Sequence, residues 1–199
     1  MEKNEVEDKY KSLIDNLGKA LGFVEENAVN SDDLEMKKAP IAEPTAVSLH
    51  AVELSEKSIN KPIKDLKILV IGGGAIGLIC ALILEKVKEC SSVILSEPNE
   101  SRLNTCSKNL KSKCLNPKDP EVDNNTFDLI FDTVGLEITR QTAIKLANPG
   151  ASIIHIGLTQ PSGIFDFRKA TLQEITFIGT YCYTNKDFAK TLDILNKNE

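Results

Sequence analysis

Residues 66–84 read LKILVIGGGAIGLICALIL, and this stretch decides the fold of the chain. It begins with a short run of branched apolar residues, which is typical of a strand buried on both faces of a sheet. Gly72, Gly74 and Gly77 follow in the spacing G-x-G-x-x-G, and an apolar helix begins directly after them. A strand, a tight glycine turn and a helix in this order predict the first half of a βαβ unit.

Each glycine of the turn has its own physical task. Gly72 permits the tight turn, Gly74 lets a pyrophosphate approach the backbone, and Gly77 lets the helix pack closely on the sheet. Ala75 and Ile76 open the helix, whose free N–H groups and positive dipole end would face the phosphates. A glycine turn that serves packing alone is the alternative interpretation.

An acidic residue follows at the spacing that a dinucleotide site requires. Glu97 ends the second predicted strand, about twenty residues beyond the last glycine. A carboxylate there accepts hydrogen bonds from ribose hydroxyls and repels a 2′-phosphate, so Glu97 favours NAD over NADP. The alternative interpretation is that Glu97 is a solvated charge at the end of a strand with no part in binding. Class I methyltransferases place an acid at the same point, which makes S-adenosylmethionine the rival ligand.

Strands and helices alternate through the rest of the chain. The predicted strands cover 66–71, 92–96, 113–116, 127–132, 151–157 and 174–181. The predicted helices cover 75–90, 99–111, 136–147 and 187–196, and 159–173 shows no clear pattern. Because parallel strands joined by right-handed crossovers form an open sheet, we expect an α/β fold with a doubly wound parallel six-stranded sheet, the Rossmann fold.

Residues 1–42 are predicted to be an acidic helical extension and linker in front of a domain of residues 43–199. Apolar residues recur at helical spacing between Val6 and Val24, and residues 1–35 hold ten acids and four bases. This helix would cover exposed core or dock on a partner. Pro44 is expected to open a short helix that ends near Glu56.

The composition restricts the class of protein. Hydrophobic residues make up 41% and charged residues 27% of the chain, which is typical of a folded domain. Since no apolar run reaches the length of a membrane span and no signal-peptide core is present, we expect a cytoplasmic protein that does not enter membranes. The net charge of −5 argues against a nucleic-acid partner. The five cysteines form no C-x-x-C pair and are expected to be free or buried thiols.

Several further segments resemble the medium-chain, zinc-type alcohol dehydrogenases of the sorbitol and threonine type. Residues 42–52, AEPTAVSLHAV, are similar to the E-P-L-A-x-x-x-H-A-V segment that precedes the cofactor domain in that family. The likeness continues through FDLIFDTVG at 127–135 to IGTY at 178–181 and covers roughly residues 27–195. A methyltransferase is not expected to match these later segments.

The resemblance implies a cofactor cleft that binds NAD(H). Ile76, Glu97 and Arg102 would contact the adenosine end, and residues 156–158 would lie against the nicotinamide. A plain surface arginine is the alternative for Arg102, and His50 and His155 are expected to be packed side chains. The complete set of expected cofactor-binding residues is Gly72, Gly74, Ala75, Ile76, Gly77, Glu97, Arg102, Thr133, Val134, Gly135, Ile156, Gly157, Leu158, Thr180, Tyr181 and Cys182.

The family resemblance also implies hydride transfer between NAD and a secondary alcohol or polyol, with zinc polarising the substrate alkoxide. The family takes zinc ligands from a cysteine and a G-H-E motif, neither of which occurs before the cofactor domain here. Only Glu43 matches a metal-site position, and a carboxylate at a helix start is its alternative role. We therefore assign no catalytic residue and expect no stable zinc site.

Three explanations of the missing motifs stay open, namely a truncated gene product, a fragment and a reduced paralogue. The alternative function is a catalytically silent dinucleotide-binding or oligomerisation module. The last predicted strand, 174–181, lies at the sheet edge, and an uncovered edge invites pairing with another copy. Related dehydrogenases associate by such an extension, so we expect a homo-oligomer.

Overall fold

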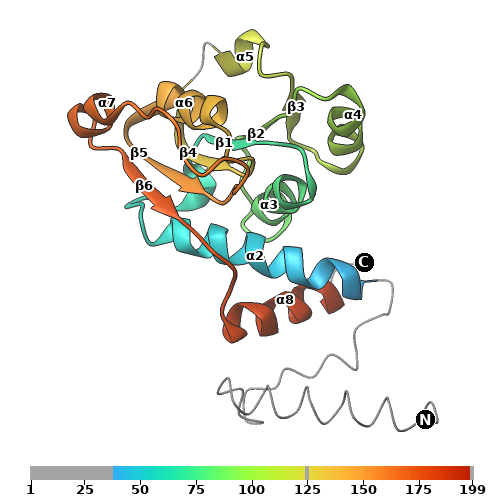
Figure 1. Cartoon of the computed structure of the whole chain (residues 1–199). Helices are drawn as coiled ribbons and strands as arrows, with labels where there is room; N and C mark the ends of the chain where they lie inside the picture. Colours follow the sequence, from blue (N-terminus) through green and yellow to red (C-terminus); the bar gives the residue numbers. More distant parts are fainter. Residues whose placement is uncertain (1–37, 124–125, 198–199) are drawn as a thin grey trace, which may run out of the picture.

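The computed structural model of this chain describes residues 38–123 and 126–197 (Figure 1). The helix expected between Val6 and Val24 lies outside the described residues. Six parallel strands form one sheet in the order β3-β2-β1-β4-β5-β6, which confirms the doubly wound sheet. The strands are β1 Ile68–Ile71, β2 Val93–Ser96, β3 Lys113–Leu115, β4 Phe127–Asp132, β5 Ala147–His155 and β6 Thr176–Gly179.

Helices cover both faces of this sheet. They are α2 Ala39–Glu56, α3 Ala75–Lys86, α4 Glu100–Asn109, α5 Pro120–Asp123, α6 Glu137–Leu146, α7 Phe167–Leu172 and α8 Asn185–Lys197, with the short 3-10 turn η2 Ile63–Asp65. The central strand β1 shows why two layers are needed. Ile68 and Val70 pack in one apolar cluster with residues of α2, α3 and α4. Leu69 and Ile71 pack in a second cluster with residues of α6.

The register of the central strands places the turns that follow them side by side at the carboxyl ends of the strands. The last residue of β1, Ile71, pairs with Ser96 of β2 and with Asp132 of β4. The strands that follow β1 are added towards β3 on one side, and those from β4 onward are added towards β6 on the other, so the strand order reverses between β1 and β4. Ligands of open α/β sheets bind beyond the carboxyl ends of the strands at such a switch point. The glycine turn, Glu97 and Thr133 therefore all lie at the carboxyl end of the sheet.

The start of α2 differs from the prediction. The helix begins at Ala39, and Pro44 lies inside it instead of opening it. Pro44 cannot donate a backbone hydrogen bond, but the hydroxyl of Thr45 donates to the carbonyl of Ile41 at 2.6 Å. Ala42 is buried, so packing of this first turn against the rest of the fold extends the helix past the proline.

Two other boundaries also differ. The featureless run 159–173 contains α7, whose first turn is capped because Asp166 accepts a hydrogen bond from the N–H of Lys169 at 2.8 Å. Strand β5 begins at Ala147, four residues before the predicted start, because the strand runs through an irregularity around Gly150 before it pairs regularly with β4. Gly150 has φ +74°, which explains why the sequence there looks like a turn.

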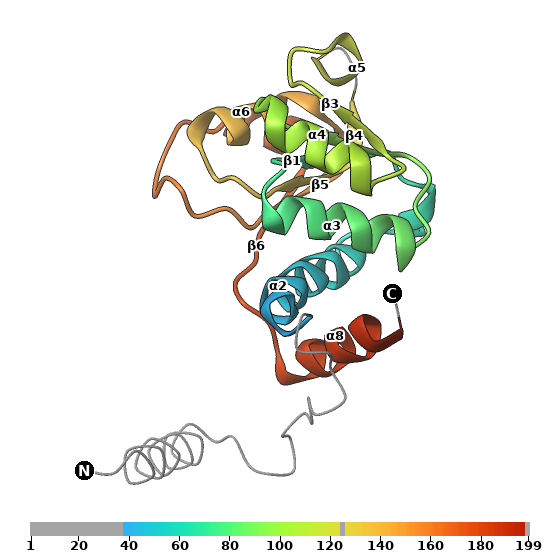
Figure 2. The same ribbon diagram turned by 90° about the vertical axis from the view of Figure 1, so that its right-hand side faces the viewer.

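Helices α2 and α8 lie side by side below the sheet (Figure 2). The ammonium of Lys190 contacts Glu53 at 2.8 Å, and His50 Nδ1 lies 2.9 Å from Asp187. At the far end of the pair, the ammonium of Lys38 donates to the carbonyl of Leu195 at 3.0 Å. Within the described ranges, none of the helices has the length and apolar character needed to cross a membrane.

Candidate functional site

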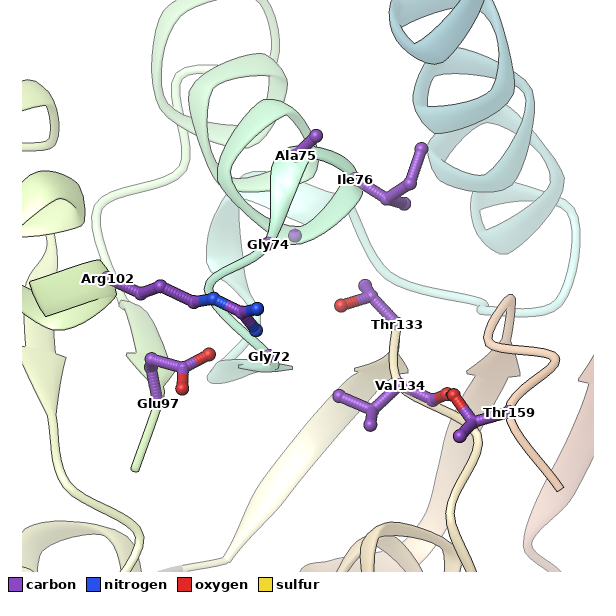
Figure 3. A pocket seen from close by; sticks show the side chains of 10 residues that line it. Gly72, Gly74, Ala75, Ile76, Glu97, Arg102, Thr133, Val134 and Thr159 are labelled. Carbon is purple, nitrogen blue, oxygen red and sulfur yellow. The ribbon is translucent and has the colours of Figure 1, made fainter. Parts of the chain in front are cut away.

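A cavity of about 270 Å³ opens beyond the carboxyl ends of β1, β2 and β4 (Figure 3). It is lined by Gly72, Gly74, Ala75, Ile76, Gly77, Glu97, Arg102, Thr133, Val134 and Thr159. The sequence predicts every one of these positions except Thr159. The structure thus brings together residues from the segments that follow four strands, β1, β2, β4 and β5, which are far apart in the chain.

The glycine turn has the close contacts that its sequence implies. Gly72 has φ +104°, a conformation that other residues rarely adopt. A Cβ atom added to Gly77 would lie 1.9 Å from the carbonyl oxygen of Gly72, so only glycine lets α3 begin this close to the strand end. A Cβ atom added to Gly74 would meet nothing within 4 Å, because this residue faces the open cavity. The start of α3 can therefore receive a phosphate at Gly74.

Glu97 is tied to the glycine turn and is not the solvated charge of the alternative interpretation. Its side chain is buried, and Oε2 accepts a hydrogen bond from the N–H of Gly73 at 2.7 Å. Oε1 accepts from the N–H of Asn99 at 2.8 Å. Asn99 in turn caps α4 by accepting from the N–H of Arg102 at 3.0 Å, which places Arg102 beside Glu97 at the same end of the cavity (Figure 3). This end combines a fixed carboxylate and a guanidinium.

The opposite wall is the turn that follows β4. The hydroxyl of Thr133 donates to the carbonyl of Ile71 at 2.8 Å and so joins this turn to the glycine turn. Asp132, which precedes it, is fully buried, and its Oδ1 accepts from the N–H groups of Val134 at 3.1 Å and Gly135 at 3.0 Å. Burial by itself would raise the pKa of Asp132, but hydrogen bonds from His155, Gly135 and Val134 bring this pKa below its ordinary value. Asp132 is therefore an anion at neutral pH.

The segment after β5 lies directly against this turn. A Cβ atom added to Gly135 would lie 2.1 Å from the carbonyl oxygen of Gly157, so a side chain at Gly135 would not fit beside this segment. The hydroxyl of Thr159 donates to the carbonyl of Val134 at 2.6 Å, which brings Thr159 into the cavity wall. Ile156 is partly buried against the core, and Leu158 is exposed and does not line the cavity.

The last three predicted cofactor residues do not line the cavity. Thr180 is buried, and its N–H donates to the carbonyl of His155 at 3.0 Å. Tyr181 and Cys182 follow β6 and are exposed, with Cys182 at φ +55°. They lie where the chain leaves the sheet edge, and no described element covers them.

The described residues do not fit a zinc site. Glu43 is exposed on α2, and among residues 38–123 and 126–197 no group of three or more His, Cys, Asp and Glu side chains could hold a metal. The only two histidines of the sequence, His50 and His155, each contact an aspartate. Burial raises the pKa of the Cys80 thiol to about 12, so this thiol stays protonated.

Comparisons with known proteins agree with this geometry. The family model described as zinc-binding dehydrogenase matches residues 75–197. The probable diacetyl reductase [(R)-acetoin forming] 2 of Saccharomyces cerevisiae is 26% identical over 196 residues, which cover 88% of this chain and 45% of the reductase. The D-xylulose reductase of the same yeast is 21% identical, over 84% of this chain and 49% of the reductase. The chain spans about half the length of the curated relatives it matches.

Solved structures share the fold. Staphylococcus aureus TarJ in complex with NADPH superimposes with a TM-score of 0.68 and 26% identity, over 78% of this chain and 49% of TarJ. The Escherichia coli CFT073 short chain alcohol dehydrogenase rspB, complexed with NADH, has a TM-score of 0.72 and 20% identity, over 83% of this chain and 49% of that protein. The two neighbours thus carry different nicotinamide cofactors.

Proposed function

Because this chain belongs to the zinc-binding dehydrogenase family, we propose that it binds NAD(H) in the cavity of Figure 3. It would be the cofactor-binding part of an oxidoreductase that transfers hydride between NAD and a secondary alcohol or polyol. The observation that carries the proposal is the link between Glu97 and the glycine turn, in which the buried carboxylate accepts from Gly73 at 2.7 Å. A turn used for packing alone needs no buried carboxylate beside it.

The arrangement of the cavity suggests how the cofactor lies. The pyrophosphate would sit at Gly74 and Ala75, where free N–H groups at the start of α3 face the cavity. The adenosine ribose would lie between Glu97 and Arg102, and the nicotinamide half would extend along Thr133 towards Thr159. In such enzymes the cofactor supplies the hydride, and the protein supplies binding and orientation.

The choice between NAD and NADP depends on Glu97. Its carboxylate cannot turn away, because both oxygens are held by backbone N–H groups. A 2′-phosphate on the ribose would meet this fixed negative charge, and the cost is larger where the charge is buried. Arg102 would favour NADP, because a guanidinium pairs well with a phosphate such as the 2′-phosphate. We propose that the carboxylate, which accepts a hydrogen bond from the glycine turn, decides for NAD.

Fluorescence titration of the purified chain with NADH and NADPH tests this. We expect NADH to bind at least about tenfold more tightly, which corresponds to about 1.4 kcal/mol. Glu97→Gln keeps the size of the side chain and should reduce this preference, whereas Arg102→Gln should leave it or increase it. S-adenosylmethionine serves as the negative control. Equal or tighter binding of NADPH to the parent chain would contradict the assignment of Glu97, and absence of binding to either cofactor would contradict the proposed function.

A second function is a silent dinucleotide-binding module. It is favoured by the lack of any metal-holding cluster in the part of the chain that the structure describes. Catalytic zinc usually has three protein ligands, and Glu43 has no companion there. We expect the chain by itself to bind NADH, to carry less than stoichiometric zinc, and to form no NADH from NAD with a panel of polyols and secondary alcohols. Turnover that follows the zinc content would overturn the silent module.

A further inference from the structure

A buried polar cluster lies behind the cavity wall that Thr133 and Val134 form. At its centre is the carboxylate of Asp132, the last residue of β4, which is fully buried. Oδ1 accepts from the N–H groups of Val134 and Gly135. Oδ2 lies 3.2 Å from the hydroxyl of Thr139 and 3.1 Å from Nδ1 of His155. A carboxylate has room for about four such partners. Three N–H donors and the Thr139 hydroxyl, which also lies 2.9 Å from the carbonyl of Leu136, surround the two oxygens of Asp132.

We propose that His155 is a positioning residue for the nicotinamide half of the bound cofactor and that it acts through Asp132. This inference rests on the proposed NAD(H) binding and adds to it. An ionised carboxylate can only accept hydrogen bonds, so Nδ1 of His155 carries the proton and donates to Oδ2. The donor holds the carboxylate in the one orientation in which Oδ1 receives both N–H groups of the turn.

The position of His155 in the sheet supports this role. It is the last residue of β5 and pairs in register with Asp132 across the two strands. Its ring lies 5.4 Å from the ring of Phe177, which fixes the imidazole from the β6 side. The preceding β5 residues, Ile153 and Ile154, are fully buried and apolar, so an aliphatic side chain would satisfy the packing of this strand. The imidazole adds a directed donor that packing does not require.

The turn has little freedom to adjust if this donor is lost. Gly135 has φ +75° and already lies against Gly157, and the N–H groups of Ile156 and Gly157 donate to the backbone carbonyl of Asp132 at 2.9 and 3.1 Å. Side chain and backbone of Asp132 are therefore both anchored to the end of β5. If the carboxylate rotates, the N–H groups of Val134 and Gly135 lose their acceptor and the cavity wall shifts.

In the described part of the chain, the carboxylate at the adenosine end of the cavity shares no hydrogen-bond partner with Asp132. Glu97 accepts hydrogen bonds from the N–H groups of Gly73 and Asn99. Among the described residues, neither of these two is hydrogen-bonded to Asp132. A change at His155 should therefore weaken a ligand that reaches Thr133 and spare one that occupies only the end near Glu97. AMP is the probe for that end, and NADH is the probe for the whole cleft.

The experiment compares His155→Leu with His155→Asn in the full chain. Leucine fills the space without a donor, whereas the asparagine amide nitrogen lies near the place of Nδ1. We expect His155→Leu to bind NADH about tenfold more weakly than the parent, the scale of one hydrogen bond to a charged group. AMP binding should stay within about twofold, and His155→Asn should restore NADH binding to within about threefold of the parent.

A double-mutant cycle with Asp132→Asn tests the route of the effect. We expect the losses of NADH affinity in Asp132→Asn and His155→Leu to be non-additive, because both variants remove the same hydrogen bond. Should His155→Leu fail to fold by circular dichroism, His155→Gln replaces it, since the longer amide no longer matches Nδ1.

The outcomes separate the two proposals. A parent chain that binds no NADH overturns the proposed function and this inference with it. A parent that binds NADH while His155→Leu binds it equally well overturns the inference alone. Equal weakening of NADH and AMP binding also overturns it, because His155 then only stabilises the domain. Additive losses in the cycle overturn it as well, because His155 then does not act through Asp132.

Discussion

At the scale of single residues, Gly74 and Gly77 belong to one motif but differ in their surroundings. A methyl group on Gly77 would collide with the carbonyl of Gly72 at 1.9 Å, whereas one on Gly74 would meet only the open cavity. Gly74 has φ −75° and ψ −174°, a conformation that alanine adopts without strain. Gly74 is thus needed for binding the ligand, and Gly77 is needed for the fold.

This difference predicts opposite effects of two conservative substitutions. Gly74→Ala should change the free energy of unfolding by less than about 1 kcal/mol, the scale of an N-cap exchange. It should weaken NADH binding at least about tenfold, because the methyl group occupies the path of the pyrophosphate. Gly77→Ala should lower the free energy of unfolding by about 1–3 kcal/mol through overpacking. Urea unfolding and NADH titration of both variants measure this, and a Gly74→Ala chain that binds NADH like the parent would refute it.

At the scale of secondary-structure elements, α8 is attached to α2 by a buried carboxylate. Asp187 Oδ2 accepts from the N–H of Thr184 at 2.8 Å and from its hydroxyl at 2.7 Å, and it lies 2.9 Å from His50. Burial alone would raise the pKa of Asp187, but the hydrogen bonds from Thr184 and His50 lower it below its ordinary value. The ionised form of Asp187 is therefore the form that stabilises the packing of the two helices.

The sign of the pH dependence follows from this direction. The pKa of Asp187 is lower in the folded chain than in the unfolded chain, where aspartate titrates near about 3.9. Its contribution to stability is complete above that value and is lost as the pH falls through the folded pKa. Urea unfolding should therefore show a stability that decreases as the pH falls below about 4, with a shallower decrease in Asp187→Asn. Asp166, which is exposed at the start of α7, provides the control variant Asp166→Asn. Identical acid profiles of the parent and Asp187→Asn would contradict the assignment.

The elements and the cleft differ in how far the sequence predicts them. The glycine turn and Glu97 are predictable because their spacing follows from local geometry within one βαβ unit. The start of α2 is not, since burial of Ala42 outweighs the proline signal. Thr159 enters the cavity wall only through its bond to Val134, a partner 25 positions earlier, and no local pattern reports such a contact. Tyr181 is predicted by family likeness alone and lies outside the cavity.

At the scale of the whole molecule, the sheet ends in an edge that the described residues leave open. β6 is the last strand in the order and pairs with β5 on one side. Large apolar side chains are exposed around this edge, namely Phe167, Leu172, Phe177 and Tyr181. Open edges beside apolar surface are sites of association between copies. We therefore propose that the chain forms a homo-oligomer through β6.

Analytical ultracentrifugation of the purified chain tests this proposal. We expect a dimer or larger assembly for the parent. The double variant Phe167→Lys, Leu172→Lys should shift the chain to the monomer, because it places two charges on α7 in the exposed apolar surface that association would bury. Val87→Lys places a lysine at an exposed apolar residue after α3, away from this surface, and should leave the assembly intact. A parent chain that sediments as a monomer at high concentration argues against the proposal.

The contact between Lys38 and Leu195 has a consequence for how this fold can be combined with others. The polypeptide chain enters and leaves the described domain at neighbouring points, since the first turn of α2 lies beside the last turn of α8. A domain with adjacent ends can be inserted into a loop of a second domain without separating the two flanks of that loop. For the same reason, a circular permutant that joins these ends by a short linker should keep the sheet intact. The geometry of α2 and α8 is therefore compatible with a second domain whose sequence lies on both sides of this one and which still folds as a single body.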